Sequence, residues 1–373
     1  MKKNMPLPQP RKEIKNFQPY IPGRPIEEIQ DKFGLKNVYK LASNENPLGC
    51  SKTVKNLLGK LYPLFHRYPE GSSLKLREKI AKKFNVSKEE VIIGAGTDEL
   101  IELLGKTYLS KEDNIVVSEH AFIRYKMAGE LMGCKVISVP MKDFTHDLFS
   151  MAKKVNKKTK IVFIANPNNP TGTYNTKDEV NWMLKYFLEK KLYPIVVFDE
   201  AYYEYAKVFN DYPDSLSLRK LYPNIVILRT FSKVYGLAGL RIGFGISRKE
   251  IIAELDRVRP PFNVSVVAQY VAEKAIDDEE HIEKSVSHVI CEKEFLYTQL
   301  DKLKIDYIKS ATNFVLINVY PKKGVDVFSK LLSKGIIVRA MDEYDLPNHI
   351  RVTIGTRKEN IKFINNFKQI IKN

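Results

Sequence analysis

The chain has 373 residues, of which 44% are hydrophobic, 28% charged and 11% aromatic. This composition is typical of folded globular proteins, and it excludes a disordered tail and a fibrous repeat. No segment approaches the roughly 18 consecutive apolar residues that a membrane span needs, so we expect no membrane partner. At roughly 150 residues per domain, the length fits two domains or one large α/β domain with an appendage.

The 61 lysines and arginines exceed the 44 aspartates and glutamates by 17. Such an excess fits a nucleic-acid-binding module, which would retain DNA or RNA in a salt-dependent way. The lysines are instead scattered singly or in pairs along the whole chain and form no stripe with interleaved aromatic residues. This pattern favours a solvated surface and no nucleic-acid partner, with a field that steers anionic small molecules.

The amino-terminal residues are polar and rich in proline, without the apolar core of a secretory signal. They predict a cytoplasmic protein. The three cysteines, Cys50, Cys134 and Cys291, show no CxxC spacing. We therefore expect neither a disulfide framework nor a metal site.

Between residues 91 and 228, short β-branched runs alternate with segments of helical periodicity. The predicted strands are Val91–Ile93, Ile115–Val117, Val136–Val139, Ile161–Ile164, Ile195–Phe198 and Ile225–Leu228. Each run is continuously apolar, which is typical of a strand that is buried on both faces. The helical segments include Glu99–Tyr108, Tyr125–Met132 and Lys177–Leu188. The alternation predicts an α/β fold whose mostly parallel sheet is sandwiched by helices.

After Pro260 the pattern changes to one long helical stretch, from Val264 to about Leu303. Predicted strands follow at Asn313–Val319, Gly335–Arg339 and His349–Thr353, and a terminal helix begins at Arg357. We expect residues 1–47 to form an arm that packs on a small α+β domain of residues 263–373. Residues 48–262 then form the large, cofactor-binding domain, and a ligand would lie in the cleft between the domains.

One lysine, Lys233, follows the last predicted parallel strand and stands close to Thr230, Ser232 and Arg241. Ligands of open α/β sheets bind at the carboxyl ends of the strands, where a lysine can be desolvated enough to form a Schiff base. The two hydroxyls and the guanidinium suit a phosphate. Taken alone, such a lysine and arginine are more often part of an ordinary surface loop.

Polar residues also follow two neighbouring predicted strands: Asp199 and Tyr202 after one, and Asn169 after the other. With Lys233 they match what a pyridine aldehyde cofactor needs. The carboxylate would keep the ring nitrogen protonated, the amide and the phenol would bond the ring oxygen, and the lysine would hold the carbonyl carbon.

Gly96, Thr97 and Asp98 open the predicted helix after the first strand. Free backbone N–H groups and the helix dipole suit an anion there, although a simple glycine turn capped by Thr97 fits the sequence as well. Phe122 follows the next strand and could stack on a cofactor ring, or belong to the core.

With these residues in place, the sequence resembles the pyridoxal-phosphate-dependent aminotransferases of fold type I, which share the aspartate aminotransferase fold, and among them the class-II histidinol-phosphate aminotransferases. The resemblance covers nearly the whole chain. It is carried by Tyr20–Gly23, Lys40–Pro47, Arg67–Pro69, Gly96–Glu99, Asn168–Gly172, Asp199–Tyr202, Thr230–Lys233, Leu240–Arg241 and Arg351–Thr356. The chain departs from the usual pattern at Val234, where many members have a smaller residue, and at Phe122, where others have tyrosine or tryptophan.

The resemblance implies that the cofactor is pyridoxal 5'-phosphate and that Lys233 binds it covalently and then moves the substrate's proton. The residues that would bind the cofactor are Gly96, Thr97, Asp98, Phe122, Asn169, Asp199, Tyr202, Thr230, Ser232, Lys233 and Arg241. The resemblance further implies a homodimer in which Tyr68 reaches the cofactor phosphate of the neighbouring subunit.

On the substrate side, the resemblance assigns Arg351 to a carboxylate, and Arg339 and Tyr20 to a substrate phosphate, with Asn44 also in contact with the substrate. The implied reaction is a ping-pong transfer from histidinol phosphate to 2-oxoglutarate in histidine biosynthesis. Because Arg339 and Arg351 fall on adjacent predicted strands, both could face the cofactor and suit anionic substrates. An aromatic amino acid aminotransferase and an amino-acid-phosphate decarboxylase of the same fold stay open as alternatives.

Overall fold

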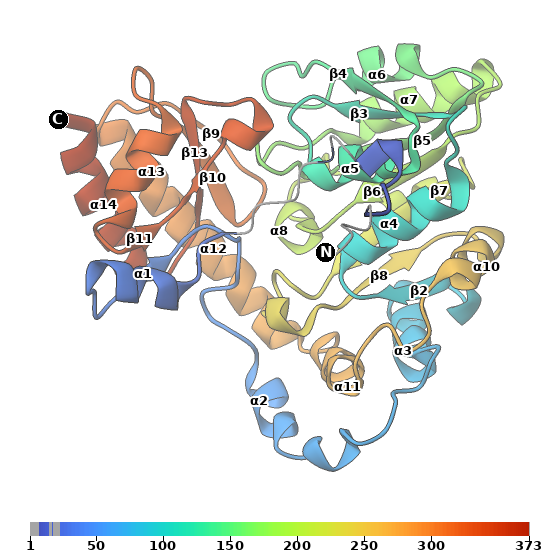
Figure 1. Cartoon of the computed structure of the whole chain (residues 1–373), viewed down its shortest axis with the longest axis horizontal. Helices are drawn as coiled ribbons and strands as arrows, with labels where there is room; N and C mark the ends of the chain where they lie inside the picture. Colours follow the sequence, from blue (N-terminus) through green and yellow to red (C-terminus); the bar gives the residue numbers. More distant parts are fainter. Residues whose placement is uncertain (1–6, 15–16, 18–22, 373) are drawn as a thin grey trace, which may run out of the picture.

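The computed structural model describes residues 7–14, 17 and 23–372 (Figure 1). Its centre is a seven-stranded sheet. The strands lie in the order β2 (Val91–Gly94), β8 (Gly243–Ile246), β7 (Ile225–Thr230), β6 (Ile195–Asp199), β5 (Thr159–Ala165), β3 (Asn114–Ser118) and β4 (Lys135–Val139). Only β8 runs antiparallel to its neighbours, β2 and β7. The predicted α/β fold with a mostly parallel sheet is confirmed.

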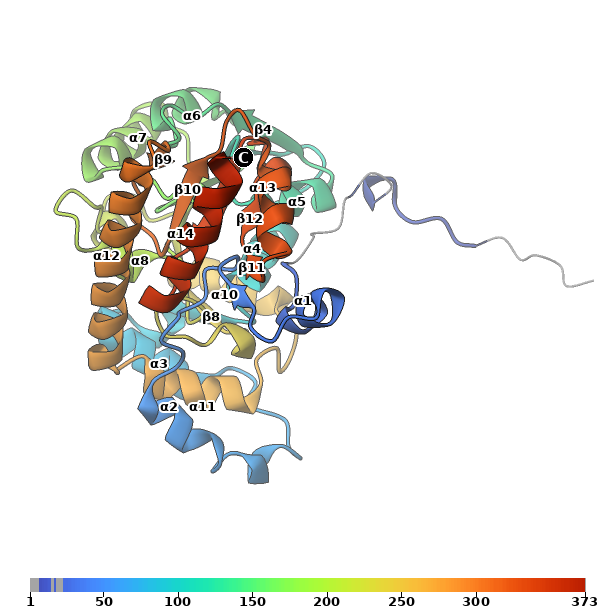
Figure 2. The same cartoon turned by 90° about the vertical axis from the view of Figure 1, so that its left-hand side faces the viewer.

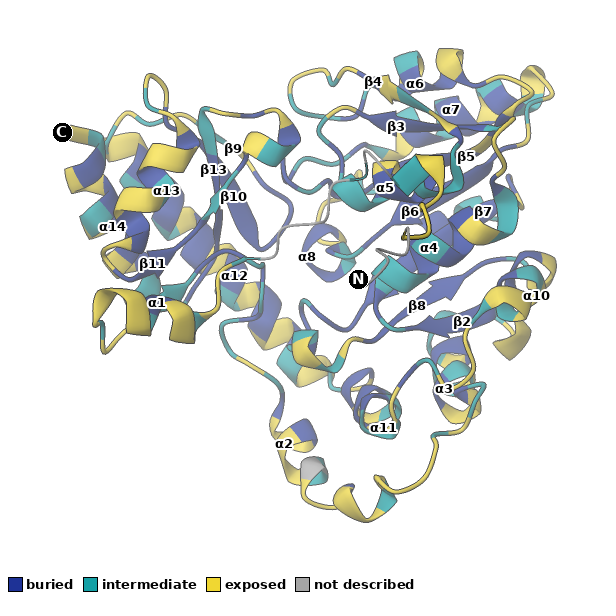
Figure 3. Cartoon of the chain, in the orientation of Figure 1, coloured by how far each residue is buried: buried dark blue, intermediate teal, exposed yellow. Residues whose placement is uncertain are grey.

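Helices cover both faces of this sheet. One face packs against α4 (Thr97–Tyr108), α5 (Ile123–Met132) and α10 (Lys249–Val258). The other packs against α3 (Leu74–Phe84), α6 (Leu148–Lys154), α7 (Lys177–Glu189) and α11 (Val266–Ala275). Each face of the sheet has its own hydrophobic core, and successive strand residues alternate between the two because their side chains point to opposite faces. Ile92, for example, belongs to the core on the α4 side, while Val91 and Ile93 belong to the core on the α3 side. Most of the sheet is therefore buried on both sides (Figure 3).

One sequence-based expectation about this sheet is wrong, and one of its strands was not predicted. Strand β4 is not buried on both faces, since Lys135 and Ser138 are exposed and only Val139 is buried; it is an edge strand with a single neighbour. Strand β8 was not predicted, because Gly243 and Gly245 interrupt its apolar run. A side chain at Gly243 would lie 3.0 Å from the carbonyl oxygen of Arg229 on β7, so the close packing of the backbones requires glycine there.

The C-terminal part forms a four-stranded antiparallel sheet beside the large one (Figure 1). Its order is β12 (Arg339–Ala340), β13 (His349–Thr353), β10 (Phe314–Asn318) and β9 (Tyr307–Ile308). The helices α12 (Glu279–Lys302) and α14 (Arg357–Lys372) lie side by side (Figure 2), and α13 (Gly324–Leu332) packs against α14.

The single helical stretch predicted from Val264 to Leu303 is wrong, because it is two helices, α11 and α12. The chain leaves α11 at Ile276, and Asp278 starts the next helix by accepting a hydrogen bond from the N–H of His281. A side-chain cap of this kind fixes a new helix start. Helix α13 and strand β9 were not predicted.

The segment before residue 48 contacts the C-terminal part. Strand β1 (Tyr39–Lys40) pairs in parallel with β11 (Ile336–Ile337), and Ile29 of α1 (Ile26–Phe33) packs near Leu332 of α13. The predicted strand at 335–339 is thus divided between β11 and β12. The domain boundaries at residues 47 and 262 stay a prediction.

The remaining short elements connect these units. They are η1 (Lys12–Ile14), α2 (Lys52–Leu58), η2 (Tyr62–Leu64), η3 (Lys88–Glu90), α8 (Tyr203–Ala206), α9 (Ser215–Leu218), η4 (Ala238–Leu240) and η5 (Asp342–Tyr344). Within the described residues, we find no helix whose length and apolar character would let it cross a membrane.

Candidate active site

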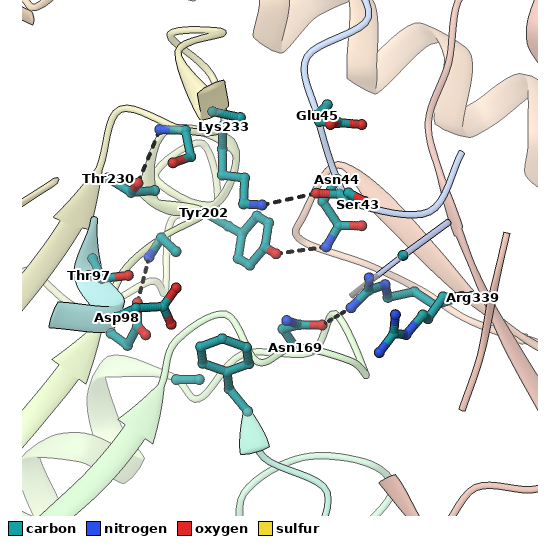
Figure 4. Close-up of a pocket in the computed structure, with 18 of the residues that line it drawn as sticks. Ser43, Asn44, Glu45, Thr97, Asp98, Asn169, Tyr202, Thr230, Lys233 and Arg339 are labelled. Atoms are coloured by element: carbon teal, nitrogen blue, oxygen red, sulfur yellow. Dashed lines mark hydrogen bonds between the residues drawn. The ribbon is translucent and has the colours of Figure 1, made fainter. Parts of the chain in front are cut away.

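A cavity of about 270 Å³ lies at the carboxyl ends of β5, β6 and β7 (Figure 4). Residues 42–45 and the C-terminal sheet form its other walls. Most of the predicted site residues line it. They are Asn44, Thr97, Asp98, Phe122, Asn169, Asp199, Tyr202, Thr230, Ser232, Lys233, Arg241, Arg339 and Arg351. Residues far apart in the sequence thus meet in one place, as expected for the strand ends of a parallel sheet.

Lys233 extends into this cavity from the loop that follows β7 (Figure 4). Its Nζ donates a hydrogen bond to the carbonyl oxygen of Ser43 at 3.2 Å. Burial, and secondly the charge of Arg351, lower the pKa of Lys233 to about 8. An appreciable fraction of the amine is therefore uncharged near neutral pH, and this is the form that attacks an aldehyde.

The loop that carries Lys233 depends on a glycine. Gly236 has a φ of +69°, and a side chain there would lie 2.2 Å from the carbonyl oxygen of Gly49. The N–H of Leu237 bonds the carbonyl oxygen of Phe231 and closes the turn. The lysine is thus held by a tight backbone turn that larger residues could not form.

The residues that open α4 form a cradle with Arg241. Gly96 has a φ of +79°, and a side chain there would lie 2.6 Å from Nη2 of Arg241. No side chain caps the start of α4. Arg241 donates to the Ser232 hydroxyl and to an Asp98 carboxylate oxygen, each at 3.4 Å. Free helix N–H groups, hydroxyls and a guanidinium fit a phosphate group.

Asp199 lies at the end of β6, with only 5% of its surface exposed. The hydroxyl of Tyr125 donates to Oδ2 at 2.8 Å, and the N–H of Ala201 donates to Oδ1 at 3.2 Å. Burial dominates over these hydrogen bonds and raises the pKa of Asp199 to about 6. A cationic partner in the cavity, such as the protonated nitrogen of a pyridine ring, would lower the free-energy cost of keeping this buried carboxylate ionised.

Sequence reasoning missed Tyr125, which it treated only as the start of a helix. Its ring stacks on Phe163 of β5, with centroids 4.8 Å apart and planes at 6°. It comes three residues after Phe122, and this spacing places both side chains on one face of the helix start. That spacing was the available signal, because Phe122 was already a candidate.

On the opposite wall, the amide of Asn44 donates to the hydroxyl of Tyr202 at 2.8 Å (Figure 4). Arg351 donates to the side-chain oxygen of Asn169 and to the carbonyl oxygen of Ala42. The Nε of Arg351 is buried without a hydrogen-bond partner among the described residues. Because both acceptors of Arg351 are neutral, its positive charge is not cancelled, which suits a carboxylate ligand.

Arg339 stands opposite Arg351 in the pairing of β12 with β13, so both residues fall on the same side of the sheet. Its Nε donates to Oε1 of Glu343 at 3.0 Å, and its Nη2 contacts the same oxygen. Sequence reasoning missed Glu343, although this carboxylate lines the cavity.

Three predicted residues do not line the cavity. Gly96 lies just behind its wall, against Arg241. Tyr68 is 82% exposed and stacks on Phe262, with ring centroids 4.8 Å apart, so it is not part of this chain's own cavity. Tyr20 lies outside the described residues.

Comparison with known proteins agrees with the geometry. Residues 36–367 match the family of class I and II aminotransferases. The histidinol-phosphate aminotransferase of Caldicellulosiruptor saccharolyticus is 44% identical, over 97% of this chain and 99% of that protein. That of Moorella thermoacetica is 43% identical, over 98% of this chain and 94% of that protein.

Among solved structures, histidinol-phosphate aminotransferase from Sinorhizobium meliloti in complex with pyridoxal-5'-phosphate superposes with a TM-score of 0.88. It is 23% identical, and the match covers 98% of each chain. An aspartate aminotransferase variant from Thermus thermophilus gives a TM-score of 0.84 at 20% identity, over 98% of this chain and all of that one. The chain therefore belongs to the class I and II aminotransferase family and, within it, to the histidinol-phosphate aminotransferases.

Proposed function

We propose that this aminotransferase uses pyridoxal 5'-phosphate to move the amino group of histidinol phosphate to 2-oxoglutarate, giving imidazole acetol phosphate and glutamate. The observation that carries the proposal is one cavity that holds a desolvated lysine, a phosphate cradle, a buried carboxylate and two arginines. Relatives more than 40% identical over nearly the whole chain are histidinol-phosphate aminotransferases. The cofactor, when bound, supplies an electron sink for the negative charge that develops on the substrate's α-carbon.

Each side chain of the cavity would have a role that follows from its position. Gly96, Thr97, Ser232 and Arg241 would hold the cofactor phosphate, and Asp199 would hold the proton at the ring nitrogen. Lys233 would take the proton from the substrate's α-carbon and return it to the neighbouring carbon of the cofactor. The lowered pKa of Lys233 suits this exchange, because a proton carrier works best with a pKa near the working pH.

The remaining predicted residues would orient the cofactor ring and the substrate. Asn169 and Tyr202 would bond the ring oxygen and Phe122 would stack on the ring. Arg339 would hold the substrate phosphate, and Arg351 would hold a carboxylate of the keto acid in the second half-reaction. An aromatic aminotransferase and an amino-acid-phosphate decarboxylase share the cofactor-binding groups, and it is the histidinol-phosphate aminotransferases more than 40% identical to this chain that favour histidinol phosphate. The cytoplasmic location stays a prediction.

The test is a half-reaction with the purified, cofactor-loaded protein. Histidinol phosphate is added without any keto acid, and the visible absorption of the lysine-bound cofactor is followed. We expect this band to disappear as the cofactor changes to its amine form, and 2-oxoglutarate should then restore it. A band that stays unchanged with histidinol phosphate but disappears with an aromatic amino acid would contradict the proposed substrate. Release of carbon dioxide from an added amino-acid phosphate, which unlike histidinol phosphate carries a carboxylate, would instead indicate the decarboxylase.

We also propose a homodimer in which Tyr68 contributes to the neighbour's site. Tyr62, Phe65 and Tyr68 are 71%, 61% and 82% exposed, and Phe262, on which Tyr68 stacks, is 45% exposed, so these residues present an exposed aromatic surface. Such a surface is costly to leave in water and is typical of an interface. The phenol would then donate a hydrogen bond to the partner's cofactor phosphate.

Mixed dimers test this proposal. Tyr68→Ala should lower turnover about tenfold or more, since it removes one hydrogen bond to a charged group, and Lys233→Ala should be inactive. A dimer with one subunit of each kind has one complete site, so co-expression should restore activity well above that of either parent. Activity that stays at the level of the Tyr68→Ala protein would show that Tyr68 serves its own subunit or none.

A further inference from the structure

The two arginines of the substrate wall have different partners. Arg351 is held by two neutral oxygens, those of Asn169 and Ala42. Arg339 is paired with a carboxylate, Glu343, four residues further along the chain. The side chains of Arg339 and Glu343 are only 13% and 22% exposed. The substrate wall, which is proposed to bind anions, thus has a carboxylate of its own on one of its two arginines.

The carboxylate of Glu343 is not part of a larger hydrogen-bond network among the described residues. Among the described residues, Arg339 is the only hydrogen-bond or ion-pair partner of Glu343. The glutamate lies on η5, a single turn whose neighbouring residues Asp342 and Asp345 are exposed. The fold therefore does not hold this carboxylate against Arg339 through any second contact of that kind.

The structure also offers a place for Glu343 to go. Glu343 and Tyr344 line both the active-site cavity and a second cavity of about 480 Å³, which lies over α5. Its lining includes Lys126, which pairs with Glu130 at 3.7 Å, and the carboxylates of Glu119 and Asp345. The second cavity gives the Glu343 side chain space to turn into when it leaves Arg339.

We propose that Glu343 is an internal competitor for Arg339, which the phosphate of the substrate displaces. The inference rests on the proposed function, because it assumes that Arg339 receives an anionic group. A phosphate carries more charge and more acceptor oxygens than a carboxylate, so it can replace Glu343 on the guanidinium. When the side chain of a substrate is neutral, Glu343 stays on Arg339, and its carboxylate continues to balance the charge of the guanidinium. Glu343 thus sets how strongly the site prefers anionic over neutral substrates.

The test is Glu343→Gln, which keeps the size of the side chain and removes its charge. Binding of inorganic phosphate to the cofactor-loaded protein is measured by calorimetry, and the saturation constant of the half-reaction is measured with histidinol phosphate and with histidinol. We expect phosphate and histidinol phosphate to bind about tenfold more tightly to the variant, which corresponds to the removal of one competing charged contact. Histidinol, which lacks the phosphate, should bind no more tightly.

Two matched variants identify the cause. Asp342→Asn removes the same charge one residue away, on an exposed side chain, and should leave the binding of phosphate unchanged. In an Arg339→Gln background, Glu343→Gln should have no effect on phosphate binding. Glu343→Ala repeats the test if the glutamine variant folds poorly, as judged by its visible cofactor absorption.

Weaker or unchanged phosphate binding in Glu343→Gln would overturn the inference, since a glutamate that merely orients Arg339 would assist binding. Equal tightening in Asp342→Asn would also overturn it, because the effect would then be a general one of charge. If the unmodified protein does not react with histidinol phosphate, the proposed function fails. The phosphate titration still decides the role of Glu343 in that case.

Discussion

Replacing Lys233 by alanine should abolish turnover and remove the visible absorption of the bound cofactor while the fold remains intact. The lysine is the amine of the cavity that can bind the aldehyde and carry the proton, and a missing proton carrier and nucleophile should lower the rate by about 10⁴-fold or more. Far-ultraviolet circular dichroism checks the fold, and the half-reaction with histidinol phosphate checks the chemistry. Full activity in this variant would contradict the assigned mechanism.

A second buried lysine provides the matched control. Burial also lowers the pKa of Lys293 to about 8, but its Nζ donates to the carbonyl oxygens of Ser310 and Thr312 and does not line the cavity. Lys293→Met should therefore keep the visible absorption. Lys233→Arg, which retains the charge but cannot form the imine, should lose it. If both Lys233 variants kept the band, the cofactor would be attached elsewhere.

Replacing Asp199 by alanine should leave part of the cofactor bound but lower turnover about 10²- to 10³-fold, the expected effect of removing one partner from a buried charged pair. The ring nitrogen would no longer be held protonated, and the cofactor would lose its capacity to accept electrons. Turnover is measured with saturating cofactor, so that weaker binding is not mistaken for slower chemistry. Near-normal turnover would show that another group holds the ring nitrogen.

Tyr125→Phe is the matched variant for this site. It removes the hydrogen bond to Oδ2 of Asp199 but leaves the carboxylate, so we expect a loss of only about tenfold. The cofactor-free protein offers a second measurement. Because burial raises the pKa of Asp199 to about 6, its ionised form destabilises the folded state at pH values above 6. Asp199→Asn without cofactor should therefore unfold at a higher temperature than the unmodified protein at pH 8, and this difference should shrink as the pH falls below 6.

The strands of the large sheet could be predicted because a parallel strand between two helical layers must be apolar on both faces, as Ile161–Ile164 and Ile195–Phe198 are. The same reasoning failed where position in the sheet, and not local composition, decides burial. Strand β4 has the same apolar appearance but lies at an edge. Strand β8 pairs with two neighbouring strands, β2 and β7, although it contains two glycines.

The site residues at the strand ends could also be predicted from the sequence. Lys233, Asp199 and Asn169 each follow a predictable strand, and the carboxyl ends of neighbouring parallel strands must meet. Tyr125 and Glu343 could not be predicted in this way. Each acquires its importance from a contact with a residue on another element, such as the hydrogen bond from Tyr125 on α5 to Asp199 on β6.

The sequence by itself therefore determined the α/β architecture, the lysine and the polar residues at the strand ends, because apolar periodicity and residue type are local properties. Only the tertiary structure decided which charges meet. The pairing of β12 with β13 sets Arg339 beside Arg351, and the turn at η5 brings Glu343 to Arg339 while Asn169 and Ala42 approach Arg351. Electrostatic interactions depend on distance and burial in space, which the order of residues along the chain does not specify.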